Sequence, residues 1–505
     1  MKIREGLNNR ILIFSVLLGL QATLLLLVVL GIVTYAPIMT LGAKILSGIV
    51  MLFILNKEEE AGYKITWVIV ILLLPMLGGI VYLVIGNKQP SKYMRKRFEK
   101  QMKHEELYRE TTGAINEIQD TYIQSQFRYL DNEGFVAYKN NKTTYYPLGD
   151  DNFVDVLKAL KSAKHFIFME YFIVEEGEMF NQILYILKQK VKEGVEVRFM
   201  YDDVGSLTML PHKYYMTLEE YGIKCITFNP FIPILSVAIN HRDHRKITVV
   251  DGWVGFTGGM NLADEYINVK MKYGHWKDTG VKIEGNSVWN LTTMFLTTWN
   301  ASKDTVEDFD KYHPRHYQPQ SFEEKGYVIP YGDSPLDNRP VGQNVYLNII
   351  NQAKRYVYIC TPYLIINETL QTALVLAKQR GVDVRICTPG IPDKKLVFRV
   401  TRSYYEDLIR HGIRIYEYTP GFLHAKNFVC DDEVATVGTI NMDYRSLFLH
   451  FECGLYMYQT ETIQSIKDDF LHTIEVSEEM TKEKVIKGRF KGIYEAILRL
   501  FAPLL

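Results

Sequence analysis

Hydrophobic positions are distributed differently in the first hundred residues and in the rest of the chain. Three long apolar runs lie near the N-terminus, at 11–33, 36–55 and 65–85, and only Lys44 interrupts the second. A membrane-spanning helix needs roughly 20 such residues. The third run contains Pro75 and Gly78, which bilayer helices tolerate when neighbouring groups satisfy the freed backbone. We therefore expect three membrane segments within residues 1–87.

A basic stretch follows these runs. Lys and Arg residues crowd positions 88–103, with Tyr93 and Phe98 among them. Cations next to a bilayer are attracted to anionic lipid by about 1 kcal/mol each; a solvated linker helix is the alternative interpretation. Basic residues next to membrane segments favour the cytoplasmic side, which predicts that residues 88–103 lie in the cytoplasm. The basic residues within 1–10 predict the same side for the N-terminus. Three crossings cannot satisfy both signals, so one segment is re-entrant or one signal is overridden.

Further along, amphipathic stretches alternate with short apolar runs, and the same order occurs twice. Residues 155–164 and then 166–174 are echoed by 347–354 and then 356–359. An ordered repeat of helices and strands predicts two α/β lobes with helices on both faces of each sheet. The pattern divides the chain into membrane segments (1–87), a basic juxtamembrane linker (88–147), a first lobe (148–305), an interlobe connection (306–340), a second lobe (341–475) and a C-terminal amphipathic segment (476–505).

Composition narrows the partners. The chain has 58 basic and 58 acidic residues, so no global basic field favours nucleic acid. Its 5 cysteines are scattered without C-x-x-C spacing, which favours neither a disulfide framework nor a zinc site. A hydrophobic content of 47% fits a soluble body joined to membrane segments.

The strongest chemical pattern is a repeated H-x-K-x4-D motif. Its two copies consist of His244, Lys246 and Asp251, and of His424, Lys426 and Asp431. Alternate side chains of a β-strand share a face, so the histidine and lysine of one copy would grip a phosphate together. Small residues and an asparagine follow each copy: Gly259 and Asn261, then Thr439 and Asn441. One copy alone would more often be a solvated strand face, but the repetition predicts one catalytic site built from both lobes.

The motif resembles that of the phospholipase D superfamily, in which H-x-K-x4-D is followed by Gly-Ser-x-Asn. The likeness extends from about residue 151 to the C-terminus, with Gly259 and Thr439 in place of the serines. Trp67, the Leu-Pro-x-x-Gly sequence at 74–78 and the Arg-Leu-x-x-Pro-Leu-Leu ending resemble bacterial cardiolipin synthases more narrowly. The implied fold is α/β, with duplicated phospholipase D-type α-β-α lobes, one active site at their interface, and preceding N-terminal transmembrane helices.

This resemblance implies covalent catalysis by two histidines. His244 would attack phosphorus to form a phosphohistidine, while His424 would protonate the leaving alcohol and later deprotonate the acceptor. Such a division of labour requires two imidazole pKa values that are pushed apart. Asp251 and Asp431 would orient the histidines. The residues expected to bind phosphate are Lys246, Lys426, Asn261, Asn441, Gly259 and Thr439; Glu265 and Glu452, which follow the two asparagines, are expected to support the site. We expect no metal, despite His241 near the first motif, and no other cofactor.

The expected reaction transfers a phosphatidyl group from one phosphatidylglycerol to another, giving cardiolipin and glycerol. We expect a multi-pass protein of the bacterial cell membrane in contact with anionic lipid. A membrane-tethered phospholipase D or nuclease with water as acceptor would use the same residues; a non-enzymatic lipid-binding scaffold is disfavoured by two complete motifs. An apolar loop at 231–235, ahead of the first motif only, favours a lipid substrate if it is not simply a buried loop.

Overall fold

The computed structural model describes residues 37–75, 77–86, 88–231, 240–318, 322–485 and 489–504, with scattered residues between 16 and 30. The first apolar run, 11–33, lies largely outside the described residues. So does the apolar loop at 231–235, apart from Phe231.

The first lobe has, in the described part of the chain, a seven-stranded sheet in the order β2-β9-β7-β6-β3-β4-β5. Strands β3, β4 and β5 are parallel, and the remaining strands pair antiparallel. The strands are β2 (Lys142–Tyr146), β3 (Phe166–Tyr171), β4 (Glu196–Asp202), β5 (Lys224–Phe228), β6 (Lys246–Val250), β7 (Val254–Gly258) and β9 (Gly280–Glu284). The helices are α7 (Gly149–Ser162), α8 (Glu178–Lys192), α9 (Tyr214–Glu220) and α10 (Val288–Lys303).

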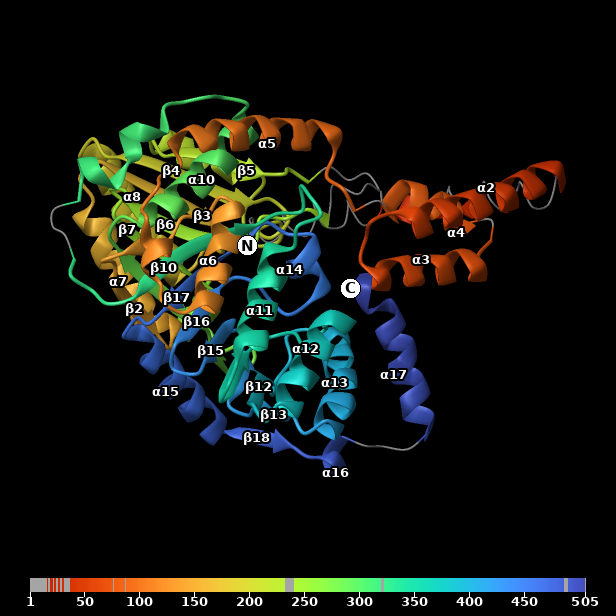
Figure 1. Cartoon of the computed structure of the whole chain (residues 1–505). Coiled ribbons are helices and arrows are strands. Elements are labelled where there is room, and N and C mark those ends of the chain that lie inside the picture. The colour runs from red at the N-terminus through yellow and green to blue at the C-terminus, as the bar shows by residue number, and fades with distance from the viewer. Residues whose placement is uncertain are drawn as a thin grey trace.

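The second lobe repeats this plan on a nine-stranded sheet, again counted over the described residues, in the order β1-β10-β17-β16-β15-β11-β12-β13-β18. Its strands are β1 (Tyr138–Lys139), β10 (Tyr327–Asp333), β11 (Tyr356–Cys360), β12 (Asp383–Pro389), β13 (Arg414–Tyr418), β15 (Asn427–Cys430), β16 (Val434–Gly438), β17 (Glu452–Tyr458) and β18 (Ser477–Met480). Its helices are α11 (Val341–Gln352), α12 (Glu368–Gln379), α13 (Lys395–Arg410), α14 (Tyr444–Phe448) and α15 (Thr462–Glu475). The duplicated α/β architecture is therefore confirmed (Figure 1).

The two sheets share a core. Helices α7 and α8 cover one face of the first sheet, and α11, α12 and α13 cover the outer face of the second. Between the sheets, apolar residues of α10 and α15 pack against both. The sheet residues in this core include Phe168 of β3 and Val429 of β15. A short parallel pair joins the lobes directly: β8 (His275–Lys277) lies beside β14 (Gly421–Leu423). These contacts fix how the two motif-bearing strands face each other.

Several expected boundaries need correction. Strands β1 and β2 come from the stretch assigned to the linker, β10 from the interlobe connection, and β18 from the C-terminal segment. β10 is the central case, because it pairs with the whole of β17. The apolar run of β10 is short, lacks polar–apolar alternation and contains Pro330, so its sequence alone did not predict a strand.

The N-terminal helices form a separate projection beside the lobes (Figure 1). They are α2 (Pro37–Asn56), α3 (Ala61–Leu73) and α4 (Leu77–Val81), followed by a π-helical turn, Tyr82–Gly86. The run at 65–85 is divided between α3 and α4, because Pro75 lacks the N–H that would continue α3. Gly79 allows a close approach to α2, where a Cβ would lie 2.4 Å from Oγ of Ser47. Among the described residues, no helix combines the length and apolar character needed to cross a membrane.

The C-terminal helix returns to this projection. After α16 (Lys482–Val485), α17 (Arg489–Phe501) leads to a 3₁₀ turn, η8 (Ala502–Leu504), beside α3. Thr66 of α3 donates a 2.7 Å hydrogen bond to the carbonyl of Leu500. The basic helix α5 (Lys92–Glu105) instead packs on α10 of the first lobe. Helix α3 and the C-terminal elements therefore meet at one side of the second lobe.

Candidate active site

Each motif lies at the start of a central strand. Lys246 is the first residue of β6, while His424 and Lys426 lie just before β15. The expectation that both histidines lie within strands is therefore wrong. The ammonium of Lys246 donates to the carbonyl of His244, and that of Lys426 donates to the carbonyl of His424. All four side chains are buried. The two motifs thus meet where the lobes join, as expected for one shared site.

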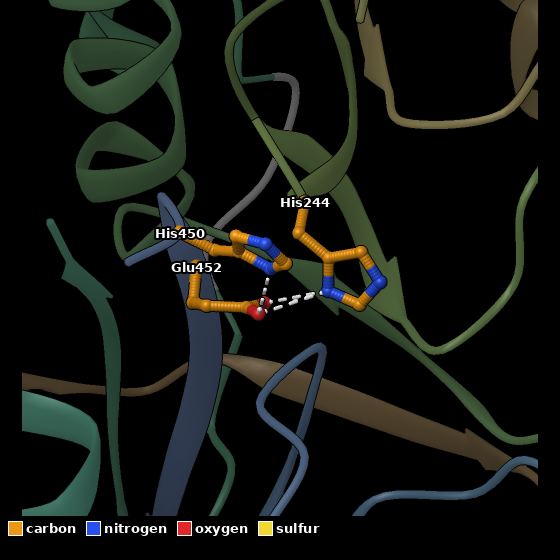
Figure 2. A group of neighbouring side chains, drawn as sticks. All are labelled: His244, His450 and Glu452. Carbon is orange, nitrogen blue, oxygen red and sulfur yellow. Dashed lines mark hydrogen bonds and ion pairs between the residues drawn. The ribbon is translucent and has the colours of Figure 1, made fainter. Parts of the chain in front are cut away.

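The histidines are held by carboxylates exchanged between the lobes. His244 of the first lobe has Nδ1 2.9 Å from both oxygens of Glu452, the first residue of β17 in the second lobe (Figure 2). His424 of the second lobe has Nδ1 2.6 Å from Oδ2 of Asp278, which lies between β8 and β9 of the first lobe. Both carboxylates are completely buried. Each lobe therefore supplies one imidazole and orients the other.

Backbone hydrogen bonds also cross between the two lobes. The N–H of His244 donates to the carbonyl of Phe451 at 2.9 Å, and the N–H of His424 donates to the carbonyl of Lys277 at 2.7 Å. In both lobes the accepting residue immediately precedes the carboxylate that holds the imidazole. The histidine backbone and ring are thus fixed to the same short segment of the opposite lobe.

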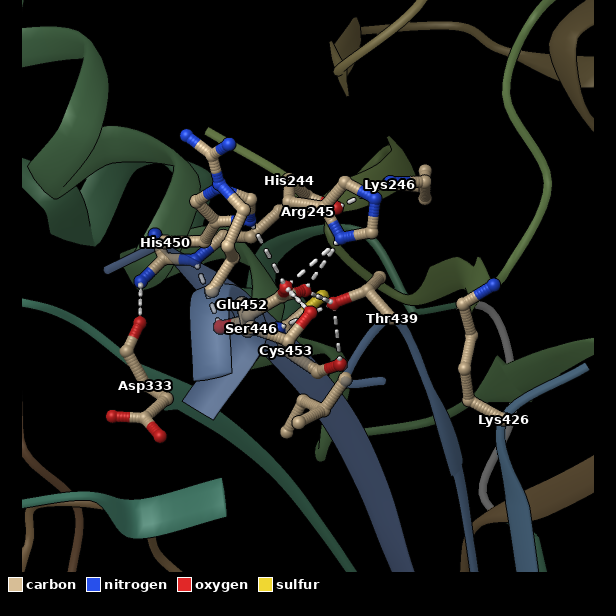
Figure 3. A network of polar contacts seen from close by, with 12 residues as sticks. His244, Arg245, Lys246, Asp333, Lys426, Thr439, Ser446, His450, Glu452 and Cys453 are labelled. Atoms are coloured by element: carbon tan, nitrogen blue, oxygen red, sulfur yellow. Dashed lines mark hydrogen bonds and ion pairs between the residues drawn. The ribbon is translucent and has the colours of Figure 1, made fainter. Parts of the chain in front are cut away.

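Glu452 is the centre of a dense polar network (Figure 3). Its oxygens accept from the hydroxyl of Thr439 and, at 2.6 Å, from the hydroxyl of Ser446 on α14. Nδ1 of His450 lies 3.7 Å from Oε1, and the rings of His450 and His244 are 5.6 Å apart. The buried guanidinium of Arg245 donates to the backbone carbonyl of Glu452 at 3.1 Å. This network leaves the carboxylate little freedom to move.

The surroundings of His424 are aromatic instead. The rings of Tyr266, Trp276 and Phe422 lie 5.6, 5.6 and 5.7 Å from its imidazole. Oδ1 of Asp278 also accepts from the N–H of Thr279 at 2.8 Å. The two halves of the site are therefore related by duplication but differ chemically, with a polar network around His244 and an aromatic enclosure around His424.

Burial sets the protonation state of both rings. It lowers the pKa of His244 to about 3 and that of His424 to about 4, although Glu452 and Asp278 oppose the shift. Both imidazoles are therefore neutral at pH 7. A ring that donates from Nδ1 to a carboxylate keeps a lone pair on Nε2. Burial lowers both pKa values together, so it does not by itself separate the two rings as the division of labour requires.

The lysines are also affected by burial. It lowers the pKa of Lys246 to about 8 and that of Lys426 to about 7, against the opposing effect of the buried carboxylates. Lys246 also acts on the other side of the site, since its charge contributes to lowering the pKa of both His424 and Lys426. Two cations held close together in a buried site attract an anion such as a phosphodiester.

The role expected for the motif aspartates is wrong. Asp251 accepts hydrogen bonds of 2.8 Å from the backbone N–H groups of Lys164, His165 and Phe166 at the start of β3. Asp431 does the same at β11, where it accepts from the N–H groups of Lys354, Arg355 and Tyr356. These carboxylates anchor neighbouring strands, and the histidines take their acceptors from the opposite lobe.

The residues expected to bind phosphate divide into two groups. Asn261 is engaged internally, since Oδ1 accepts from the N–H of Ile173 at 3.0 Å and Nδ2 donates to the hydroxyl of Tyr266 at 2.6 Å. The N–H groups of Gly259 and Thr439 donate to the carbonyls of Thr279 and Cys453. Within the described structure, the buried Oδ1 of Asn441 has no hydrogen-bond partner. Of the two asparagines, Asn441 is thus the better candidate for a substrate contact.

Glu265 is not the counterpart of Glu452. A carboxylate oxygen of Glu265 accepts from the ammonium of Lys272 at 2.9 Å. The counterpart of Glu452 by position is Asp278, which the motif pattern did not predict. A signal was present: Asp278-Thr279-Gly280 parallels Glu452-Cys453-Gly454, an acid two residues before a strand glycine. The longer loop between Asn261 and Asp278 obscures this parallel. His450 was not predicted either, because the first motif copy has no histidine at the equivalent position.

His244, His450 and Glu452 have the composition of a metal site, with one potential ligand atom from each within 4.8 Å of the others. The carboxylate oxygens, however, already accept from His244, Thr439 and Ser446. A cation there would have to displace the bond that orients His244. The hydrogen-bond network accounts for this cluster without a metal.

Comparison with known proteins agrees with this geometry. The chain matches the family model "Cardiolipin synthase, PLD-like domain" at residues 156–278 and 346–474, and "Phospholipase_D-nuclease N-terminal" at 45–87. A cardiolipin synthase of Halalkalibacterium halodurans is 34% identical over 90% of this chain and 91% of its own length. Cardiolipin synthase 2 of Bacillus cereus is 36% identical over 90% of this chain and 89% of its own length.

A more similar relative has no assigned activity. It is an uncharacterized protein of Streptococcus mutans, 44% identical over 90% of this chain and 99% of its own length. Among solved structures, a phosphatidylserine synthase of Haemophilus influenzae matches with a TM-score of 0.56 and 15% identity, covering 75% of this chain and 97% of its own. That likeness supports the fold alone. From the extent of the sequence matches, the chain belongs to the cardiolipin synthase family of the phospholipase D superfamily.

Proposed function

We propose that this chain synthesises cardiolipin by transferring a phosphatidyl group from one phosphatidylglycerol to a hydroxyl of another, with release of glycerol. The observation that carries the proposal is the crossed arrangement of the site. Each of two neutral imidazoles is oriented through Nδ1 by a carboxylate of the opposite lobe, and the ammonium of a buried lysine binds the backbone carbonyl of each histidine. This is what an exchange between two phosphodiesters requires: a nucleophile, a proton carrier and cations over the phosphate oxygens.

In the first step, Nε2 of His244 attacks phosphorus and the bond to the glycerol oxygen breaks. A bound phosphodiester adds negative charge beside His424, which favours the imidazolium form, so Nε2–H of His424 protonates the leaving oxygen. Lys246, Lys426 and the amide of Asn441 stabilise the charge on the non-bridging oxygens. Asp251 and Asp431 contribute indirectly by anchoring β3 and β11, which lie next to the motif strands β6 and β15.

In the second step, neutral His424 accepts the proton of the incoming hydroxyl. The hydroxyl oxygen attacks phosphorus, the bond to His244 breaks, and a second phosphodiester forms. One phosphodiester replaces another, so the balance requires no activated nucleotide. Glu452 stabilises the developing positive charge on His244 during both steps.

We further propose that the N-terminal region anchors the enzyme in the bacterial cell membrane. Helices α2 and α3 expose large apolar side chains, including Leu41, Ile49, Phe53, Ile65 and Leu73. An exposed apolar surface of this kind marks a membrane or protein contact. The basic residues of α5 would lie near anionic headgroups, and the apolar face of α17 would rest at the same interface. Residues 1–87 would then be the membrane unit, and the two lobes the catalytic unit.

The direct test is product analysis by mass spectrometry, with the purified full-length protein and phosphatidylglycerol in mixed micelles. Cardiolipin and glycerol should form in equal amounts, without added nucleotide. Phosphatidic acid as the main product would assign water as the acceptor and contradict the transferase. The His244→Ala protein is the control for contaminating activity.

A further inference from the structure

The proposed reaction involves two phosphates, but the clamp of Lys246 and Lys426 accommodates one. During the second step that clamp holds the phosphatidyl group attached to His244, while the acceptor lipid brings its own negatively charged phosphodiester. A second anion next to the first is costly unless further cations compensate it. The acceptor therefore requires a separate cationic pocket within reach of its headgroup glycerol.

A pocket with these properties lies where the N-terminal helices meet the rim of the site. It has a volume of about 50 Å³ and is lined from one side by Tyr63, Trp67, Gly86 and Lys88, from a second by Pro503 and Leu504, and from a third by Asn240, Arg445 and Leu449. The apolar walls come from α3 and η8, the part of the molecule that we place against the membrane. The polar wall belongs to the catalytic lobes.

Lys88 and Arg445 both line this pocket. The Lys88 ammonium lies over the ring of Tyr63, and Glu59, whose charge acts on Lys88, pairs with Lys57 at 3.1 Å. Burial lowers the pKa of Lys88 to about 7, although Glu59 and Glu60 oppose the shift. A bound anion would offset that cost. The guanidinium of Arg445 contacts Oδ1 of Asn240 at 3.3 Å.

The pocket is connected to the catalytic histidine by one short helix. Arg445 and Ser446 are consecutive residues of α14, and the N–H groups of both donate to the capping carboxylate of Asp443. Ser446 donates to Glu452, which orients His244. Leu449 lines the pocket, and the ring of the next residue, His450, is 5.6 Å from that of His244. The pocket and the imidazole of His244 are therefore linked through α14 and the residues that follow it.

We propose that Lys88 and Arg445 bind the phosphodiester of the acceptor phospholipid, and that this pocket selects an anionic lipid as acceptor over a neutral alcohol. The inference rests on the proposed function. It distinguishes the acceptor, which needs the pocket, from the donor, whose phosphate occupies the lysine clamp.

The test compares two acceptors in one reaction. Full-length protein is given phosphatidylglycerol in mixed micelles with 1-butanol, and the ratio of cardiolipin to phosphatidylbutanol is measured. In Lys88→Gln and Arg445→Gln this ratio should fall about tenfold, the scale of one lost charge-assisted contact. Arg445→Lys should recover part of the ratio. The matched control is Lys188→Gln, which removes another lysine over a tyrosine ring, that of Tyr221 on the outer side of the first lobe.

Three outcomes would overturn the assignment. A parallel loss of both products, or a lower melting temperature that accounts for the loss, would show a structural role. Unchanged amounts of both products would show that the pocket does not bind the acceptor. Phosphatidic acid, an anionic lipid without an acceptor hydroxyl, should suppress cardiolipin more than phosphatidylbutanol in the unmodified protein; stimulation would instead assign the pocket to a resident lipid. If the unmodified protein forms phosphatidylbutanol but no cardiolipin, the proposed function fails independently of the variants.

Discussion

A Cβ atom on Gly259 would lie 2.0 Å from Oδ1 of Asp278, the carboxylate that holds His424. The second lobe differs at both positions, since Thr439 donates its hydroxyl to the longer side chain of Glu452. A short acid is thus matched with glycine, and a long acid with a hydroxyl-bearing residue. The missing motif serine is therefore explained by the local geometry of each half.

Gly259→Ser, which restores the motif serine, should lower kcat rather than raise it. The new Cβ displaces Asp278, and His424 loses its orientation, so we expect a loss of at least about tenfold, the lower range for impaired general acid–base catalysis. Steady-state kinetics with phosphatidylglycerol measures it. Thr439→Ser keeps the hydroxyl on Glu452 and should lose much less; equal losses in the two variants would contradict the pairing.

Neutralising either exchanged carboxylate should impair turnover. Glu452→Gln and Asp278→Asn retain size but not the charge that stabilises an imidazolium, and we expect kcat to fall about 10²–10⁴-fold. The KM for phosphatidylglycerol should change little, because neither group reaches the substrate. Asp251→Asn serves as the contrasting variant. It weakens the anchoring of β3, so its main effect should be a lower melting temperature.

Substitution of the two histidines should affect turnover and adduct formation differently. His244→Ala should abolish turnover and form no covalent lipid adduct. His424→Ala should still accumulate a phosphatidyl-enzyme from a donor whose leaving group needs no proton, recovering much of the roughly 10²–10⁴-fold that general acid catalysis supplies. Mass spectrometry of quenched reactions locates the adduct. An adduct on His424 in the His244→Ala protein would reverse the assignment of the nucleophile.

Substrate binding should take up protons. The free protein holds His424 neutral, with a pKa of about 4, and Lys426 partly neutral, with a pKa of about 7. A bound phosphodiester raises both pKa values, so affinity should fall as pH rises through the values of the bound state. Calorimetric titration with glycerophosphoglycerol at pH 7.5, in two buffers of different ionisation enthalpy, measures the uptake. Identical heats in both buffers would contradict the protonation scheme.

Deleting residues 1–87 should weaken membrane association and also destabilise the second lobe. Tyr63 of α3 is buried against Tyr444 and Phe448, with ring centroids 5.5 and 6.4 Å away. Liposome flotation and thermal unfolding measure the two effects separately. Tyr63→Ala in the full-length chain should cost about 3 kcal/mol of stability, as expected for a large-to-small change of a buried aromatic residue. A truncated protein as stable as the intact one would show that this contact contributes nothing.

The duplication was predictable from sequence because both motifs keep the same internal spacing. The crossed carboxylates were only half predictable. Glu452 follows Asn441 closely, but Asp278 is displaced by a loop, and nothing in either copy indicates that its partner belongs to the other lobe. The aspartate of the motif was misassigned because its position predicts nearness to the histidine, whereas its side chain turns toward backbone donors of β3. Strand β10 was missed because its pairing with β17 depends on residues far away in the sequence.

The exchanged acids also affect how the protein is made. A chain emerging from the ribosome completes β6 and α10 well before β17 is synthesised, so His244 exists for a time without Glu452. In that interval its ring has no acceptor to fix the reactive tautomer, and His424 has not yet been made. The catalytic site is therefore incomplete until both halves of the chain have folded together.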